Sequence, residues 1–289
     1  MSQRSDDAVQ EFHYRLPYRA SGQRPGSHPG TSLGSGQEFV SHMSLYDRPD
    51  PRRLDLRASV RSTTGDWLVR VNRQRVGVAV QLLVDVSASM NFGAQRSKLQ
   101  VSADFVASLG HSAFRIGDAL GMLAFDHRER PDLCMPATLS RGLGGVMADS
   151  LRGCDTTAGG IEGLEEAVMQ LTGREALVFL VSDFHWPLDR LGAVLDLLSH
   201  TFVVPVVVWD PAEIEPPPHD AVAPLRDAES GVRRTLFLRP KLRAQWREGV
   251  AARRAELDAF FSARDLRAFY IHGAFDAEAM SQYFFEATA

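Results

Sequence analysis

The sequence predicts an α/β fold: a doubly wound, mostly parallel β-sheet with helices on both faces, plus an N-terminal arm and an inserted edge hairpin. Two observations support this prediction most directly. Apolar runs of strand length alternate with amphipathic stretches of helix length over most of the chain. Several of these runs are apolar at every position and rich in β-branched residues, which is typical of parallel strands buried on both faces.

The bulk composition is that of an ordinary globular protein. The chain has 289 residues, of which 44% are hydrophobic, enough for one large domain with an appendage. The formal net charge of −4 gives no reason to expect nucleic acid or an anionic membrane as a partner. Cys134 and Cys154 are the only cysteines and form no CxxC motif, so we expect both to be reduced.

The sequence carries no recognisable targeting or spanning segment. Its first residues are polar and lack the apolar core of a signal peptide. The longest apolar runs, Val76–Val84 and Phe202–Trp209, are much shorter than the roughly 20 residues that a spanning helix needs. We therefore expect a cytoplasmic protein with no membrane span.

Residues 1–40 are predicted to form an extended N-terminal arm, because residues 21–36 are rich in glycine and proline and offer little to bury. A short apolar patch at Phe12–Tyr18 is expected to dock on the main body.

Residues 41–75 form an Arg-rich lead-in segment with interleaved aspartates, ahead of a strand near Trp67–Val71. The segment lacks the aromatic interleaving of single-strand nucleic-acid binders, so we interpret it as an ion-paired surface. We expect Arg53 and Asp55 to anchor the arm to the domain through ion pairs and hydrogen bonds.

Residues 76–289 are predicted to form the main domain, in which strands and helices alternate. The expected strands are Val76–Val84, Asp118–Phe125, Ala176–Val181, Phe202–Trp209 and Arg267–His272. The expected helices are Lys98–Arg115, Ile161–Leu171, Leu188–Leu198, Pro240–Arg264 and Asp276–Phe285. Turn-rich residues at about 211–238 predict an inserted loop and hairpin at the sheet edge, with a short strand at Arg234–Leu238.

Polar side chains follow two of the buried strands. The first strand stops at Asp85-Val-Ser87-Ala-Ser89, and the strand near 177–181 stops at Ser182-Asp183. Ligands of open parallel sheets bind outside the carboxyl ends of the strands, so Asp85 and Asp183 face one crevice if these strands are adjacent. Carboxylate and hydroxyl oxygens suit Mg²⁺, Mn²⁺ or Ca²⁺ and suit Zn²⁺ poorly.

Further candidates lie in nearby loops. Thr156 and Thr157 precede a predicted helix and offer another hydroxyl ligand. Met90, His185 and Trp186 flank the strand-end loops, so we expect them at the rim, where a partner would make contact. Asp118 and Asp126, which bracket an apolar strand, are interpreted as turn residues rather than ligands.

The strand-end residues resemble a known site. Asp85-x-Ser87-x-Ser89, a Thr before a later helix, and Asp183 after the next strand are similar to the metal-ion-dependent adhesion site of von Willebrand A domains. The resemblance implies that Ser87, Ser89 and a Thr bind a divalent cation directly, Mg²⁺ before Mn²⁺ or Ca²⁺. Asp85 and Asp183 would then act largely through water. Thr156 and Thr157 both fit the Thr position.

Flanking stretches resemble the family known as domain of unknown function 58, over roughly residues 34 to 285. These stretches are Gly34–Phe39, Asp50–Arg61 and Asp227–Gly231. Leu56 departs from the family pattern, since many members have Trp there. Members commonly accompany MoxR-type AAA+ ATPases, which implies such an ATPase, its client, or both as partners. The stretch Pro49–Ser59 is most similar to the S-type proteins of methanol-oxidation operons, which implies methanol dehydrogenase as a client.

Together the residues and the resemblance favour a metal-dependent interaction module that acts as an adaptor or assembly factor, not an enzyme. The first alternative is a metal-dependent hydrolase or phosphatase, for which His185 is the one candidate base. Ser87 is a poor nucleophile candidate, because no Gly-x-Ser-x-Gly elbow surrounds it. The second alternative is a structural subunit with a vestigial metal site.

Overall fold

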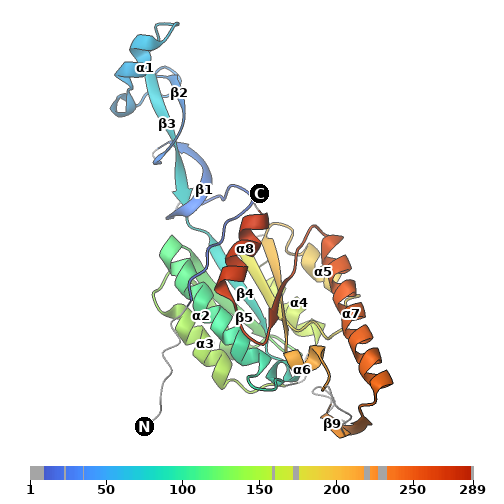
Figure 1. Ribbon diagram of the computed structural model, residues 1–289. Helices are drawn as coiled ribbons and strands as arrows, with labels where there is room; N and C mark the ends of the chain where they lie inside the picture. The colour runs from blue at the N-terminus through green and yellow to red at the C-terminus, as the bar shows by residue number, and fades with distance from the viewer. Residues whose placement is uncertain are drawn as a thin grey trace.

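A six-stranded sheet forms the main body of the protein, with the strand order β11-β8-β7-β4-β5-β6 (Figure 1). The computed structural model describes residues 10–22, 24–34, 36–157, 160–171, 176–217, 222–226 and 233–287. Only β6 runs antiparallel to its neighbour in this sheet, and the other pairings are parallel. The predicted doubly wound, mostly parallel sheet is therefore confirmed, and it is consistent with a von Willebrand A-like fold.

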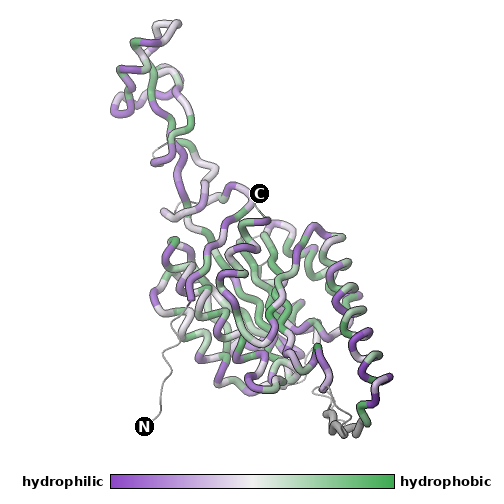
Figure 2. The backbone as a smooth tube through the Cα atoms, in the orientation of Figure 1, coloured by the Kyte–Doolittle hydropathy of each residue, from purple (hydrophilic) through white to green (hydrophobic). Residues whose placement is uncertain are grey.

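The strands of this sheet are short and mostly apolar, as Figure 2 shows by their colour. They are β4 (Ala79–Asp85), β5 (Ala119–Phe125), β6 (Met135–Thr138), β7 (Leu177–Ser182), β8 (Phe202–Trp209) and β11 (Phe269–His272). Every residue of β5 and β7 is buried, which explains why neither strand alternates in polarity.

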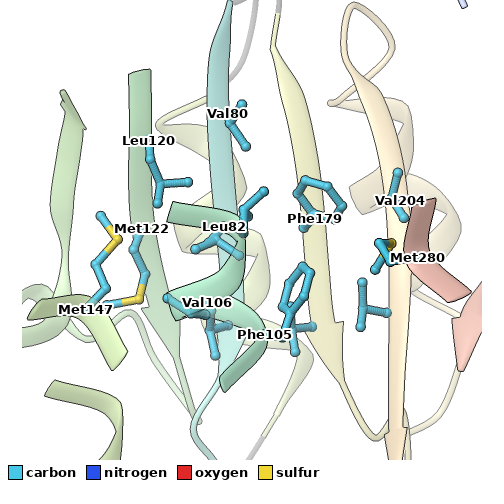
Figure 3. Close-up of a cluster of buried hydrophobic side chains, with 14 of the residues drawn as sticks. Val80, Leu82, Phe105, Val106, Leu120, Met122, Met147, Phe179, Val204 and Met280 are labelled. Carbon is cyan, nitrogen blue, oxygen red and sulfur yellow. The ribbon is translucent and has the colours of Figure 1, made fainter. Parts of the chain in front are cut away.

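Helices cover both faces of the sheet, and each face is closed by its own apolar cluster. The helices on one face are α2 (Lys98–Ile116), α3 (Leu143–Gly153) and α8 (Ala277–Ala287). Those on the other are α4 (Ile161–Met169), α5 (Leu191–Asp196) and α7 (Pro240–Ser262). Figure 3 shows the first cluster, in which the rings of Phe105 and Phe179 lie 5.4 Å apart.

Two elements, β6 and α3, lie in a stretch for which the sequence predicted none. Glycines at the start of α3 hide its helical pattern, although Met147 and Leu151 are fully buried on one face. Packing requires a glycine at position 144, because a Cβ there would lie 2.7 Å from the Cα of Gly110 in α2. The two helices therefore touch backbone to backbone.

A second, three-stranded antiparallel sheet projects from the main body (Figure 1). It comprises β1 (Pro25–Gly34), β2 (Glu38–Ser44) and β3 (Leu68–Val76), with η1 (Pro51–Arg53) and α1 (Leu56–Arg61) between β2 and β3. The boundary expected at residue 40 thus falls inside β2. The run expected as one strand at 76–84 is divided at Gly77, because its first residue belongs to β3 and β4 begins at Ala79.

The N-terminal segment packs as predicted. Phe12 is buried against Phe105 and Phe275, and its backbone N–H donates to the Ser112 hydroxyl. Arg53 donates to the carbonyl oxygen of Gly34 at the end of β1.

Asp55 caps α1 by accepting from the Ala58 N–H, and it forms an ion pair with Arg70 of β3. These bonds of Arg53 and Asp55 stay within the projecting sheet and its connections, so the prediction that the two residues anchor the arm to the main domain is wrong.

The insertion after β8 begins with a one-turn helix, α6 (Pro211–Ile214), and contains the antiparallel hairpin β9 (Val222–Arg226) and β10 (Arg233–Phe237). The predicted hairpin is present. It forms a two-stranded sheet of its own, however, and does not extend the edge of the six-stranded sheet.

Candidate functional site

Two adjacent strands end in polar residues at the same edge of the main sheet. β4 and β7 are paired in parallel, with Val84 opposite Val181, and β8 lies on the far side of β7. Asp85 ends β4, and Asp183 directly follows β7. The adjacency that the sequence argument required is therefore present, and the Ser182 hydroxyl donates to Asp85 Oδ2 at 2.7 Å.

The Asp-x-Ser-x-Ser loop folds back on its own carboxylate. Asp85 is buried, and its Oδ1 accepts from the backbone N–H of Ser87 at 2.9 Å. The hydroxyl oxygens of Ser87 and Ser89 lie 3.1 Å apart. Ser89 also hydrogen-bonds to Asp183. Four predicted ligands, Asp85, Ser87, Ser89 and Asp183, are thus brought together.

The structure adds two residues that the sequence analysis did not assign to the site, Lys98 and Glu213. Lys98 is the first residue of α2 and is only 1% exposed. Its Nζ donates to Asp183 Oδ2 and to Glu213 Oε1, each at 2.6 Å. Glu213 reaches the site from α6, after β8. One signal was available: of 32 lysines and arginines, only Lys98 and Lys241 are lysines.

Burial and mutual repulsion shape the ionisation of the two aspartates. Burial, together with the negative charge of Asp183, raises the pKa of Asp85 to about 6. Burial also acts to raise the pKa of Asp183, but the charges of Lys98 and His185 and hydrogen bonds from Lys98 and Ser89 outweigh it and lower that pKa. Likewise Asp183 and Glu213 outweigh burial and raise the pKa of Lys98.

The charges of this cluster do not balance. Asp85, Asp183 and Glu213 are three carboxylates, and Lys98 is the one ammonium group that contacts them. Nearby Arg253 is ion-paired with Glu256 and donates to backbone carbonyls. Counting His185 as neutral, two negative charges are left over, which is the charge that one divalent cation would neutralise.

The threonine loop lies beside this cluster, but the Thr157 hydroxyl does not point into it. Thr157 pairs with Ser87 as an isolated β-bridge, and its carbonyl accepts from the Ala88 N–H at 2.6 Å. Its hydroxyl donates to Asp126 Oδ2, also at 2.6 Å. Thr156 is partly buried in the same loop.

Asp126 is a buried carboxylate beside the threonine loop, and the sequence predicted only a turn residue at this position. It is 1% exposed, accepts from the Arg128 N–H and forms an ion pair with Arg130. It is therefore more than a turn residue, because it fixes the orientation of the Thr157 hydroxyl.

The expected rim residues divide into two groups. Met90 is fully buried in the core, so the prediction that it lies at the rim is wrong. The residue lies in η2 (Ala88–Asn91), which turns it inward. His185 is 44% exposed at its side chain and lies 3.6 Å from Glu213 Oε1. Trp186 is partly buried, and its indole N–H donates to Asp85 Oδ2 at 3.4 Å.

The turn that carries Asp183 and His185 has an unusual backbone. Phe184 adopts a left-handed conformation with φ of 52°, which is rare for a bulky residue and costs roughly 1 kcal/mol or more. Its ring is buried against Phe261, and its N–H donates to the Ser182 hydroxyl. Arg253 of α7 donates to its carbonyl oxygen. The surrounding structure thus holds a strained turn at the site.

A cavity of about 280 Å³ adjoins the site between the end of β8, α6 and α7. His185 and Glu213 belong to both the site and the cavity wall. The remaining wall is mostly apolar and includes Trp209, Ile214 and Trp246.

The donor set decides which cation would fit. Among the described residues, no three His, Cys, Asp or Glu side chains are arranged to hold a metal by themselves. A cation here would rely on the hydroxyls of Ser87 and Ser89 as well as on carboxylates. Such an all-oxygen set fits Mg²⁺ and is unsuited to Zn²⁺.

Comparison with known families agrees with the sequence resemblance. The family described as protein of unknown function DUF58 matches residues 47–256, which is more than half of the chain. The chain belongs to the DUF58 family.

Similar proteins add no established activity to this DUF58 chain. The uncharacterized protein Rv1480 of Mycobacterium tuberculosis is 26% identical over 257 residues, covering 86% of this chain and 79% of that protein. The uncharacterized protein Mb1516 of Mycobacterium bovis matches to the same extent.

Among solved structures, BatB from Bacteroides thetaiotaomicron is 16% identical with a TM-score of 0.42, covering 74% of this chain and 100% of that chain. An aerotolerance-related membrane protein from Bacteroides fragilis is 16% identical with a TM-score of 0.43, covering 73% of this chain and 98% of that chain. Similarity this low says nothing about what the DUF58 chain binds. No helix in the described part of the chain is long and apolar enough to cross a bilayer.

Proposed function

We propose that this DUF58 protein is a protein-interaction module whose strand-end site binds Mg²⁺ and, through it, a carboxylate of a partner protein. The observation that carries the proposal is the convergence of Asp85, Ser87, Ser89 and Asp183 in a buried cluster, which together with Glu213 carries two more negative charges than its one ammonium group. A divalent cation would neutralise this excess, and its open coordination position would accept an oxygen from outside.

Individual residues would have distinct parts in holding the cation. Ser87 and Ser89 present their hydroxyls, and the carboxylates of Asp85 and Asp183 supply charge, directly or through water. Thr157 is the better placed of the two threonines, because its backbone is already bridged to Ser87. Its hydroxyl would have to turn away from Asp126 to join the set.

The partner is a MoxR-type AAA+ ATPase or its client protein, and the sequence resemblance further suggests maturation of a metalloenzyme such as methanol dehydrogenase. His185 and Trp186 form the partly exposed rim that the partner would contact. The Trp186 side chain also ties this rim to Asp85, so the rim and the cation site share one hydrogen-bond network.

The test is a pull-down with the tagged full chain and a candidate MoxR-type ATPase, with Mg²⁺ and with EDTA. We expect retention of the ATPase or its client in Mg²⁺, and loss in EDTA or in the Ser87→Ala, Ser89→Ala double variant. Both serines lie at a strand end, so the sheet should stay folded, which circular dichroism checks. Retention of the partner in EDTA would contradict the bridging role.

His185→Ala separates the adaptor from a hydrolase. An adaptor needs the cation and its outer ligand, so this variant loses one rim contact but should still retain the partner in Mg²⁺. A hydrolase needs a base beside the cation, and His185 is the histidine close to Asp183 and Glu213. Metal-dependent cleavage of a phosphoester or amide that is lost in His185→Ala would favour the enzyme instead.

A further inference from the structure

The buried ammonium of Lys98 lies where a cation ligand is expected. An ammonium group has three donors, and two of them are used on Asp183 and Glu213. The side chains of Lys98 and Asp183 are 1% and 0% exposed, so water cannot easily replace either partner. The ammonium thus neutralises one carboxylate of the site that we propose for Mg²⁺.

A divalent cation and this ammonium compete for the same oxygen atoms. Asp183 Oδ2 lies 2.6 Å from Nζ, which leaves little room for a metal ion in front of that atom. Two cations that share one carboxylate at this range also repel each other strongly in a buried environment. Glu213 offers the ammonium a second partner outside the Asp-x-Ser-x-Ser cluster.

We infer that Lys98 is a built-in competitor of the metal: its ammonium neutralises Asp183 in the metal-free protein and stays with Glu213 alone once a divalent cation binds. The inference rests on the proposed function and names the residues that set the metal affinity of that site.

The competition also connects the metal to the surface around it. Glu213 belongs to α6, where it completes a capping box with Asp210, and its carbonyl oxygen accepts from the Trp246 indole of α7. Glu213 and Trp246 both line the cavity beside His185. A change in the bonding of Lys98 therefore reaches the wall of this cavity through a single side chain.

The experiment is a calorimetric titration of Mg²⁺ into the chelator-treated full chain, with the melting temperature as a second measurement. Four proteins are compared: wild type, Lys98→Met, Glu213→Gln and Lys241→Met. Lys241 is the matched control, since it is the other lysine of the chain and is exposed at the start of α7.

We expect Lys98→Met to bind Mg²⁺ about tenfold or more tightly than wild type, because it removes the competing charge. Without metal this variant should melt at a lower temperature, since Asp183 loses its partner, and Mg²⁺ should restore more stability to it than to wild type. Glu213→Gln should bind Mg²⁺ more weakly, because the ammonium then depends on Asp183 alone. Lys241→Met should match wild type.

The outcomes separate this inference from the proposed function. Equal Mg²⁺ affinity in wild type and Lys98→Met would overturn the competition and leave the metal site intact. Binding by Lys98→Met but not by wild type would support the competition and remove metal bridging from the natural protein. No binding by either protein overturns both. If Lys98→Met does not fold, unchanged affinity in Glu213→Gln overturns the competition by itself.

Discussion

Carboxylates are buried at both the amino and the carboxyl ends of the strands of the main sheet, and their bonding partners differ between the two ends. At the amino end, Asp118 stands alone, just before β5. At the carboxyl end, Asp85 and Asp183 lie side by side with Glu213 nearby. Both groups are essentially hidden from solvent, so burial alone does not tell a structural carboxylate from a functional one.

The amino-end carboxylate is fully used in holding the chain together. Asp118 Oδ1 accepts from the backbone N–H of Val78 at 2.9 Å. Its Oδ2 accepts from the Tyr14 hydroxyl at 2.7 Å and lies 2.8 Å from the His28 ring nitrogen. These contacts join the N-terminal segment, β1 and the start of the main sheet at one point.

The carboxyl-end carboxylates are in excess over their cations. Their hydrogen bonds come mostly from neighbouring loops, and Lys98 is the one permanent positive charge in contact with them, because His185 adds a charge only when it is protonated. A buried charge excess is costly, and groups with strongly perturbed pKa values cluster at functional sites. The difference teaches that mutual repulsion between carboxylates, more than burial, marks the candidate site, because the single amino-end carboxylate is fully used by three partners.

The largest effect is expected from Asp118→Ala. Three donors would lose their acceptor in a buried place, so we expect a loss of roughly 4 kcal/mol in the free energy of unfolding and a fall of roughly 10 °C in melting temperature. Mg²⁺ affinity, measured by calorimetry on the folded fraction, should not change.

Asp118→Asn is the control, because its amide keeps the shape of the side chain and one acceptor oxygen. It should lose less stability than Asp118→Ala. A loss of Mg²⁺ binding in either variant would show that the two ends are coupled and would weaken the comparison.

The second-largest effect is expected at the carboxyl end, where the contribution of Asp85 to stability should depend on pH. The pKa of Asp85 is raised to about 6, against about 3.9 in an unfolded chain, so folding favours its protonated form. In chelator, wild type should therefore lose stability relative to Asp85→Asn as the pH rises from about 4 to about 6, by roughly 3 kcal/mol, and should stay level above that.

Urea unfolding of both proteins across this pH range checks the sign. Taking the difference between them removes contributions from groups that they share. Saturating Mg²⁺ should weaken or reverse the slope, because a metal stabilises the carboxylate form. A stability difference that does not vary with pH would show that folding does not raise the pKa of Asp85.

Much of the main sheet was predictable, because its strands are buried on both faces and therefore apolar throughout. The same apolar runs located Asp85 and Asp183, since the polar residue that ends such a run must lie at a sheet edge. The places of Lys98 and Glu213 in the site were not predictable in this way. Lys98 lies 85 residues before its partner Asp183, and Glu213 lies 115 residues after its partner Lys98. Their contact depends on tertiary packing of α2 and α6.

Asp118 shows the same limit at the other end. Its partners Tyr14 and His28 precede it by 104 and 90 residues, in a segment that reads as a loose arm. The Gly- and Pro-rich composition around His28 hid β1, whose strand character comes from pairing with β3. Short-range patterns thus found the strands but missed the side chains that join distant segments.

The smallest effect tests whether neutral donors hold the carboxylate at the amino end. Tyr14→Phe removes one hydroxyl and keeps the ring, which packs near Phe12 and Phe284. Asp118 would retain its bonds to Val78 and His28, so we expect a loss of about 2 kcal/mol, a usual net value for one hydrogen bond to a charged group. Burial and Asp118 raise the pKa of Tyr14, so its hydroxyl is a neutral donor at physiological pH. The loss, measured by urea unfolding, should therefore be the same at low and high salt. A clear dependence on salt would mean that an ion pair holds this end together, and the contrast between the two ends would fail.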